Sequence, residues 1–386
     1  MATLGKTYRP MGLLKEARDI GLHVLEARRT ILSDKHPDTF TSMTYVATAL
    51  RASGDYAAAV KLETEKLEGW TKLRGSSHPE TLEAMAGLAW ALACQGHYGR
   101  AAQLNSHSLS SQLELRGAKY WFSIWTMHSM AVILGMQGKY FEAEELCART
   151  LSLRIQHMKA SHPFCYVSKL YLAWLYNETG RYKKAEAVEL EVLEFQKTFY
   201  NSDIHNDVLH TKAQLASTHT FMGRHQEAEQ IKREVLSSRL NLSGEQHPVT
   251  LRCKSSLGLT CMELGKMSEA KTLLSDAWTC QQTVLGAEHP ETLTTMSRTA
   301  KLFQRQGRRQ EAEQCYRDVV EMSIKALGAS HPRTEARLTD LNLFENTRRN
   351  SDTKLMLRSI ETIKSTNVNI ETLTIVDERE VDEDED

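Results

Sequence analysis

A glycine followed five residues later by an alanine recurs seven times in this chain, and successive glycines stand 42 or 43 residues apart. A His-Pro dipeptide recurs at the same step and contains six of the seven prolines. Self-similarity at a fixed period of this length is typical of a solenoid, in which each unit buries its apolar face only against its neighbours. The sequence therefore predicts one elongated array of seven units, numbered here from 1 to 7. Their glycine and alanine pairs are Gly54/Ala59, Gly96/Ala101, Gly138/Ala143, Gly180/Ala185, Gly223/Ala228, Gly265/Ala270 and Gly307/Ala312.

Each unit carries two stretches with helical periodicity. In unit 2, apolar side chains recur at helical spacing over residues 80–95, and Gly96 then supplies the left-handed residue that ends a helix. A second periodic stretch runs from residue 98 to about residue 115. Proline is favoured at the first position of a helix, and the residue before it is kept out of the helical region, so His-Pro predicts the start of the first helix. Each unit is therefore a helix, a glycine turn and a second helix.

The turn segments carry a family resemblance. Leu172-Ala173 followed by Gly180-Arg-Tyr-Lys-Lys-Ala185 resembles the tetratricopeptide repeat. The 42-residue pitch and the His-Pro-x-Thr start resemble the longer repeat of kinesin light chains and of light-chain-like proteins in fungi and bacteria. The resemblance covers roughly residues 36–348 and implies an all-α fold, a right-handed superhelical solenoid of helix-turn-helix repeats with half-repeat caps. A HEAT or armadillo array has a similar pitch and is the alternative, but the sevenfold glycine turn favours the first interpretation.

The chain divides into three predicted segments. Residues 1–35 form an N-terminal segment with a capping helix at about 12–32, and residues 36–348 hold the seven repeats with a C-terminal capping helix at about 334–348. Residues 349–386 form a tail, with room for a short helix before an acidic end. The last ten residues, 377–386, hold eight carboxylates, and such a block repels itself and favours disorder. A solubilising role and a contact with a basic partner are the two interpretations of this tail.

Composition limits the function. The 48 basic and 49 acidic residues give a net charge of −1, which lacks the clustered basic excess that nucleic-acid binding requires. No apolar run is long enough to span a membrane and no signal-peptide core is present, so we expect no membrane contact and a cytoplasmic location. The seven cysteines are scattered without a Cys-x-x-Cys pair, which predicts buried free thiols and neither a disulfide framework nor a metal site. No cofactor is predicted.

Candidate functional residues lie on the first helices. In the family that the chain resembles, these helices line the concave face, with lining positions about thirteen, ten, six, three and two residues before the turn glycine. Half-buried tryptophans beside polar groups are typical of a peptide or small-molecule site. Units 3 and 5 also break the repeat pattern, since Tyr120-Trp121 replaces His-Pro and unit 5 gains one residue, and such departures favour a functional site. The predicted groove residues are Trp90, Trp125, His128, Trp174, Asn177, His210 and Phe221.

Two functions are compatible with these residues. The leading hypothesis is a non-enzymatic scaffold or adaptor whose aromatic groove binds a protein or peptide partner. The alternative is an atypical enzyme or carrier for an apolar small molecule, for instance in a fungal secondary-metabolite pathway, with His128, His210 or Glu178 moving a proton. The sequence contains none of the common catalytic or nucleotide-binding motifs, and the paired asparagines with which kinesin light chains hold a cargo peptide are missing. End-to-end self-assembly and simple packing of the aromatic rings are further interpretations.

Overall fold

The computed structural model describes residues 14–346, and every regular element in that range is an α-helix. None of these helices is both long and apolar enough to cross a bilayer. The all-α class is therefore confirmed, whereas the predicted tail 349–386 and the first two residues of the predicted N-terminal cap lie outside the described range. The helices are α2 (Leu14–Leu32), α3 (Pro37–Ser53), α4 (Tyr56–Arg74), α5 (Pro79–Cys94), α6 (Tyr98–Arg116), α7 (Trp121–Met136), α8 (Tyr140–Met158), α9 (Pro163–Glu178), α10 (Tyr182–Tyr200), α11 (Asn206–Phe221), α12 (His225–Ser243), α13 (Pro248–Glu263), α14 (Met267–Val284), α15 (Pro290–Arg305), α16 (Arg309–Leu327) and a further helix over 332–346.

Units 1 to 7 are the seven successive pairs from α3 and α4 to α15 and α16, and the predicted start and turn signals are found where expected. In unit 1, the Nδ1 atom of His36 accepts a hydrogen bond from the backbone N–H of Asp38, and Pro37 is the first helical residue. Gly54 ends α3 in the left-handed region at φ 85°. In unit 5, which lacks the proline, His205 still caps α11 through the N–H of Asp207. A histidine can therefore cap the helix without a following proline.

A second set of left-handed residues ends the even-numbered helices. Gly75, Gly117, Gly244, Gly286 and Gly328 all have a positive φ and stand at the same repeat step. Units 3 and 4 have Lys159 at φ 71° and Asn201 at φ 47° in this place. Unit 3, which departs from the sequence pattern at Tyr120-Trp121, and unit 4 therefore carry non-glycine residues in a conformation that side chains rarely adopt.

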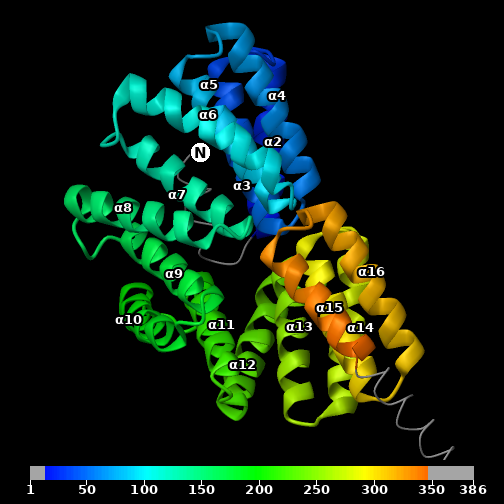
Figure 1. The fold of residues 1–386 in the computed structure, drawn as a ribbon. Coiled ribbons are helices and arrows are strands. Elements are labelled where there is room, and N and C mark those ends of the chain that lie inside the picture. The colour runs from blue at the N-terminus through cyan, green and yellow to red at the C-terminus, as the bar shows by residue number, and fades with distance from the viewer. Residues whose placement is uncertain (1–13, 347–386) are drawn as a thin grey trace, which may run out of the picture.

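The odd-numbered helices form the inner layer of the array. Successive odd helices contact one another, as in α3 with α5 and α13 with α15, and their residues are buried on several faces. The even-numbered helices bury a narrower stripe, and α10 and α16 lie at the periphery (Figure 1). Because the inner layer is curved more tightly than the outer one, the array winds into a superhelix whose inner surface belongs to the odd-numbered helices.

The superhelix makes a full turn and touches itself. In Figure 1 the yellow and orange helices at the end of the array lie beside the blue helices at its start. His247 places Nε2 2.8 Å from the carbonyl oxygen of Ala52, at the end of α3. The same contact joins His289 to Cys94 at 3.2 Å and His331 to Met136 at 2.8 Å, and each pair is separated by 195 residues. Unit 1 therefore meets unit 6, unit 2 meets unit 7, and unit 3 meets the helix over 332–346. We call this line of contacts the seam.

Three turn glycines pack into the seam. A Cβ atom on Gly54 would lie 2.5 Å from the ring of Pro248, and one on Gly138 would lie 2.2 Å from the ring of Pro332. Gly96 approaches Pro290 in the same way, at 2.7 Å. The turn glycines of units 4 to 7 have open space at this position. The glycines of units 1 to 3 therefore meet a steric requirement that the other four do not.

Candidate binding site inside the superhelix

Charged side chains gather on the inner surface beside the seam. Arg252 on α13, Arg298 on α15 and Arg333 at the start of the helix over 332–346 all act electrostatically on Glu291 of α15. The guanidinium of Arg252 stands 3.8 Å from the Glu291 carboxylate, and Arg298 donates a hydrogen bond to Ser255 Oγ at 2.9 Å. We call the three arginines around Glu291 the arginine cluster.

These side chains are reachable by solvent although protein surrounds them. The side chains of Arg252, Glu291 and Arg333 are 45%, 35% and 37% exposed. Burial is nevertheless the largest influence on the pKa of each. Burial alone would raise the pKa of Glu291, but the neighbouring guanidiniums outweigh it and hold the pKa below its ordinary value. We call the partly exposed inner surface that carries these side chains the lumen.

The cluster is connected to the aromatic units across the seam. Arg333 lies 3.4 Å from Oε1 of Glu178, at the end of α9, and Tyr140 donates its hydroxyl hydrogen to Oε2 of Glu178 at 3.0 Å. Burial and the Glu178 carboxylate both raise the pKa of Tyr140. Glu178 therefore links unit 3, unit 4 and the helix over 332–346, and its carboxylate is already engaged by two partners.

Trp174 and His128 share a neighbour, the ring of Tyr171. The ring of Tyr171 stacks on Trp174 at 5.3 Å and meets His128 edge-on at 6.0 Å. Tyr171 also donates its hydroxyl hydrogen to the carbonyl oxygen of Ala131 at 3.1 Å. A Cβ atom on Gly135 would lie 2.0 Å from the Tyr171 hydroxyl oxygen, so the ring closely covers this glycine of α7. Two of the residues proposed from the sequence are thus brought together by Tyr171, and the half-buried Trp174 contributes to the packing of α7 on α9.

The other aromatic groove residues are spread along the inner layer. Trp90 on α5 and Trp125 on α7 are half-buried, and Trp125 contacts the ring of Phe122 at 5.0 Å. Phe221 at the end of α11 is exposed and stacks on Tyr182 at 5.6 Å. These rings therefore line separate parts of the array rather than one compact pocket.

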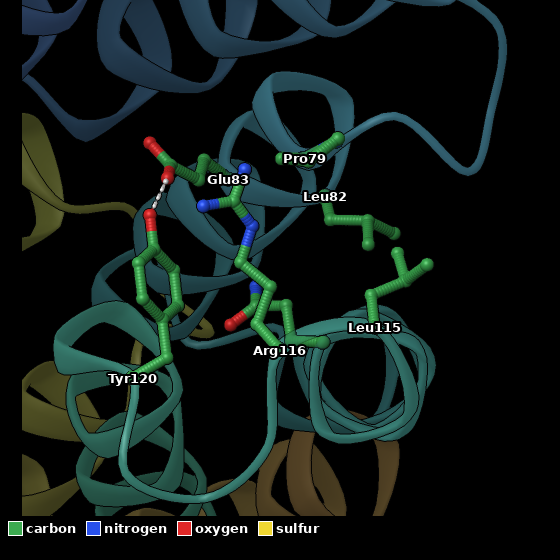
Figure 2. Close-up of a pocket in the computed structure, with 7 residues that line it drawn as sticks. Pro79, Leu82, Glu83, Leu115, Arg116 and Tyr120 are labelled. Carbon is green, nitrogen blue, oxygen red and sulfur yellow. Dashed lines mark hydrogen bonds between the residues drawn. The ribbon is translucent and has the colours of Figure 1, made fainter.

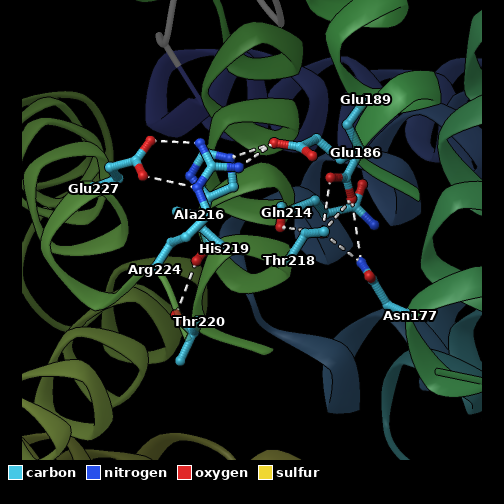
Figure 3. A network of polar contacts seen from close by, with 10 residues as sticks. All are labelled: Asn177, Glu186, Glu189, Gln214, Ala216, Thr218, His219, Thr220, Arg224 and Glu227. Atoms are coloured by element: carbon cyan, nitrogen blue, oxygen red, sulfur yellow. Dashed lines mark hydrogen bonds and ion pairs between the residues drawn. The ribbon is translucent and has the colours of Figure 1, made fainter. Parts of the chain in front are cut away.

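Asn177 serves a buried network instead of the lumen surface. Its side-chain amide donates to Oε1 of Glu189 at 3.2 Å and to Oγ1 of Thr218 at 2.7 Å (Figure 3). Glu189 is fully buried, and burial raises its pKa to about 7. On the neighbouring face of α11, His219 contacts Glu186, which also pairs with Arg224. The polar side chain of Asn177 is therefore used to join α9, α10 and α11.

The Tyr120-Trp121 departure has a local structural explanation. Tyr120 takes the capping position before α7, and its hydroxyl lies 3.4 Å from Oε1 of Glu83 (Figure 2). The Arg116 guanidinium covers the tyrosine ring at 4.8 Å from the ring centre. The space that these residues enclose with Leu82 and Leu115 is about 10 Å³, which is room for a single water molecule at most. Here a tyrosine-glutamate contact replaces the histidine cap, and no ligand site results.

The two histidines proposed for proton transfer have strongly lowered pKa values. His128 is buried and its Nδ1 has no hydrogen-bond partner in the described structure, and burial lowers its pKa to about 3. The His210 side chain is exposed, and crowding by the surrounding protein followed by the Arg252 and Arg239 charges lowers its pKa to about 4. Both imidazoles are therefore neutral and weakly basic at neutral pH, far from the value that suits a general base.

One trio of side chains has ligand atoms close enough to share a metal ion. Within residues 14–346, Glu229, Cys261 and Glu269 place one such atom each within 4.8 Å of the others. Arg233 already pairs with both carboxylates at 2.7 Å, and burial raises the pKa of the Cys261 thiol to about 11. The two carboxylates are therefore paired with Arg233 around a neutral thiol, and this arrangement fits a metal ion poorly.

None of the three clustered arginines is among the groove residues predicted from the sequence. Arg252 stands thirteen residues before its turn glycine, so the family's lining register contains it, whereas Arg298 stands nine residues before its turn glycine and lies outside that register. The groove residues were predicted around aromatic side chains, so these arginines were not among them. Arg333 follows a His-Pro pair and meets Glu178, 155 residues earlier, and no local pattern indicates that contact.

Comparisons with known proteins agree with this architecture. A family model described as tetratricopeptide repeat matches residues 1–68, 122–198, 207–279 and 255–325, which together make up more than half of the chain. The crystal structure of NprR with its cognate peptide NprX is 15% identical with a TM-score of 0.60, over 92% of this chain and 99% of that chain. The apo form of RapI is 14% identical with a TM-score of 0.51, over 74% and 97%. The TPR-like repeats of a candidate kinesin light chain from Podosopora anserina are 21% identical with a TM-score of 0.41, over 53% and 97%. No curated protein matches the chain.

Proposed function

Because this chain belongs to the tetratricopeptide repeat family, we propose that it is a non-enzymatic interaction scaffold that binds a peptide segment of a partner inside its lumen. The observation that carries this proposal is the interior itself, where Arg252 and Arg333 remain solvent-accessible while protein surrounds them. NprR, which shares the fold, is a peptide-binding protein, and that likeness supports the proposal without establishing it.

The lumen offers both kinds of contact that a peptide uses. Trp125 and Trp174 are half-buried aromatic anchors on α7 and α9, and aromatic and arginine side chains dominate the energetics of protein interfaces. The arginine cluster supplies guanidiniums that bind carboxylates with bidentate geometry. A segment crossing from unit 3 towards unit 7 would meet the rings first and the charges second.

The chain's seven cysteines are all free, which supports a reducing compartment such as the cytoplasm.

The proposal can be tested with peptides selected on the full chain. A displayed library of random peptides is selected against the wild-type protein, and the enriched sequences are synthesised and their dissociation constants measured. We expect the double variant Trp125→Ala, Trp174→Ala to weaken binding at least tenfold, since truncating an anchor residue typically costs about 2 kcal/mol or more.

A matched control separates loss of a binding surface from loss of an aromatic ring. Phe141 on α8 is 83% exposed on the outer layer, so Phe141→Ala removes an aromatic side chain without touching the lumen. The control should bind the selected peptides like the wild type. Equal binding by the Trp125→Ala, Trp174→Ala variant and the wild type, with the fold intact by circular dichroism, would contradict the proposal.

The small-molecule alternative has weaker support. The lowered pKa values of His128 and His210 are unsuited to proton transfer at neutral pH, and Glu178 is held by Tyr140 and Arg333. A crevice of about 250 Å³ lies at the seam beside Tyr56 and His289, and none of these three residues lines it. Native mass spectrometry of the purified chain tests this alternative directly, because a retained mass of a few hundred daltons would favour it over the scaffold.

A further inference from the structure

The arginine cluster carries more positive charge than its surroundings neutralise. A fourth guanidinium, that of Arg337, is buried beside it and donates to the hydroxyl oxygens of Ser323 at 2.7 Å and Thr294 at 3.2 Å. Arg298 likewise has a neutral hydrogen-bond partner in Ser255. Burial and the neighbouring guanidiniums lower the pKa of Arg337 to about 10.

The carboxylates of Glu178, Glu291 and Asp340 act on this group of four arginines, and Asp340, near Arg337, already pairs with Lys301 at 2.8 Å. Glu291 faces Arg252, and Glu178 faces Arg333. Like charges held close together repel one another, so a further carboxylate beside them would be stabilised. The exposed guanidiniums of Arg252 and Arg333 are the groups that an incoming anion can reach. The cluster is therefore a site for a carboxylate-rich segment.

The chain itself contains such a segment. Residues 377–386 hold eight carboxylates and one arginine. The described helix over 332–346 begins in the arginine cluster with Arg333, so its last residue lies about 20 Å from the cluster at 1.5 Å per residue. The 30 residues 347–376 exceed what this distance requires, because the fully extended length of 30 residues is about 100 Å. The acidic segment is thus tethered within reach of the basic site.

We propose that residues 377–386 bind the arginine cluster of their own chain and occupy the lumen until a partner segment displaces them. This inference rests on the proposed function, since it uses the same interior as the peptide site. A tether of this length gives the segment an effective concentration in the millimolar range, so even a weak intrinsic affinity suffices for occupancy. Attraction between exposed charges weakens with salt, and displacement becomes easier as ionic strength rises.

The test uses the full chain and a synthetic probe. In a neutral-tail variant, all eight carboxylates of residues 377–386 are replaced by the corresponding amides, Asp→Asn and Glu→Gln. The probe is a fluorescent peptide with the wild-type sequence of residues 375–386, and its dissociation constant is measured by anisotropy at low and high salt. We expect the neutral-tail chain to bind the probe at least tenfold more tightly than the wild type, because its own tail no longer competes.

Charge-matched variants locate the binding site. In the neutral-tail background, Arg252→Gln with Arg298→Gln should weaken probe binding at least tenfold. The pair Arg233→Gln and Arg317→Gln removes two exposed arginines from the outer helices α12 and α16 and should leave binding unchanged. Arg252→Lys with Arg298→Lys keeps the charge and should retain most of the affinity, which guards against a fold defect as the cause.

Three outcomes would overturn the inference. Equal probe affinity of the wild-type and neutral-tail chains would show that the tail does not occupy the site. No probe binding by any chain would show that the cluster does not bind carboxylate-rich segments. Concentration-dependent dimerisation of the wild type that the neutral tail abolishes would place the tail in a second copy. In each case, selected peptides that depend on Trp125 and Trp174 would still support the proposed function, so the two failures are distinguishable.

Discussion

The imidazole of His247 lies 2.8 Å from the backbone carbonyl oxygen of Ala52, which is 195 residues earlier in the chain. The same imidazole accepts a hydrogen bond from the N–H of Val249 through Nδ1, so its proton must be on Nε2 and is donated across the seam. One histidine thus caps its own helix and contacts the previous turn of the superhelix. His289 and His331 repeat the arrangement, which makes the seam a periodic structure rather than a single contact.

The seam glycines should tolerate alanine less well than the other turn glycines. Gly180→Ala places a side chain at φ 75° with open space around it, and the expected loss of stability is about 1 kcal/mol. Gly54→Ala has the same backbone cost at φ 85° and also forces Cβ to within 2.5 Å of Pro248, so roughly 2–4 kcal/mol is expected. Urea unfolding measures both losses of stability. Equal losses would mean that the seam can shift to accept the new side chain without a free-energy penalty.

A comparison of two histidines that form the same helix cap distinguishes the free energy of the cap from that of the seam contact. His162 accepts the N–H of Phe164 at 3.2 Å, as His247 accepts that of Val249 at 3.2 Å, but only His247 also reaches the previous turn. His162→Ala should cost about 1 kcal/mol for the lost cap. His247→Ala should cost about 1 kcal/mol more, for the hydrogen bond to Ala52. Hydrogen exchange near residue 52 should accelerate only in His247→Ala, and acceleration in both variants would argue against a local seam contact.

Acid should open the seam. Burial is the main cause that lowers the pKa of His247, His289 and His331 below the ordinary value of 6.5, and the hydrogen bonds to the carbonyl oxygens offset it only in part. A histidine whose pKa is lower in the folded state than in the unfolded state stabilises the fold when the pH is above its unfolded-state pKa. This contribution is lost as the pH falls through its folded-state pKa. We therefore expect faster hydrogen exchange at the seam and a larger radius of gyration by small-angle scattering below about pH 6 than at pH 7.5. A pH-independent radius would contradict this.

Glu189→Gln should stabilise the protein at alkaline pH. Burial raises the pKa of Glu189 from 4.5 to about 7. The protonated carboxyl therefore contributes to the free energy of unfolding, and this contribution is lost as the pH rises through the pKa of the folded state. At pH 5 the variant and the wild type should differ little. At pH 8 the variant should be more stable by up to about 3 kcal/mol, because the amide cannot ionise. Urea midpoints across this range measure the difference, and an advantage that did not grow with pH would show that Glu189 is not buried as a neutral acid.

Much of the candidate site depends on contacts that sequence spacing cannot reveal. Trp125 and Trp174 are found on inner helices, as the family register predicts, because that register follows the helical period. Asn177 has the same register but is buried against Glu189 of the following helix, since a partner carboxylate is available there. The arginine cluster combines residues from α13, α15 and the helix over 332–346 with Glu178 of α9, and only the winding of the array brings these elements together.

The sequence by itself determined the two-helix unit, its turns and the number of units. Those features depend on local backbone chemistry: proline and a histidine cap start a helix, and a glycine in the left-handed region ends it. Only the tertiary structure decided that Gly54 is packed against Pro248 while Gly180 faces open space, although both glycines have the same place in their units. The packing angles between neighbouring helices, summed over five units, set where one turn of the superhelix meets the next. No local motif encodes that sum, and the seam and the enclosed lumen therefore appear only in the folded molecule.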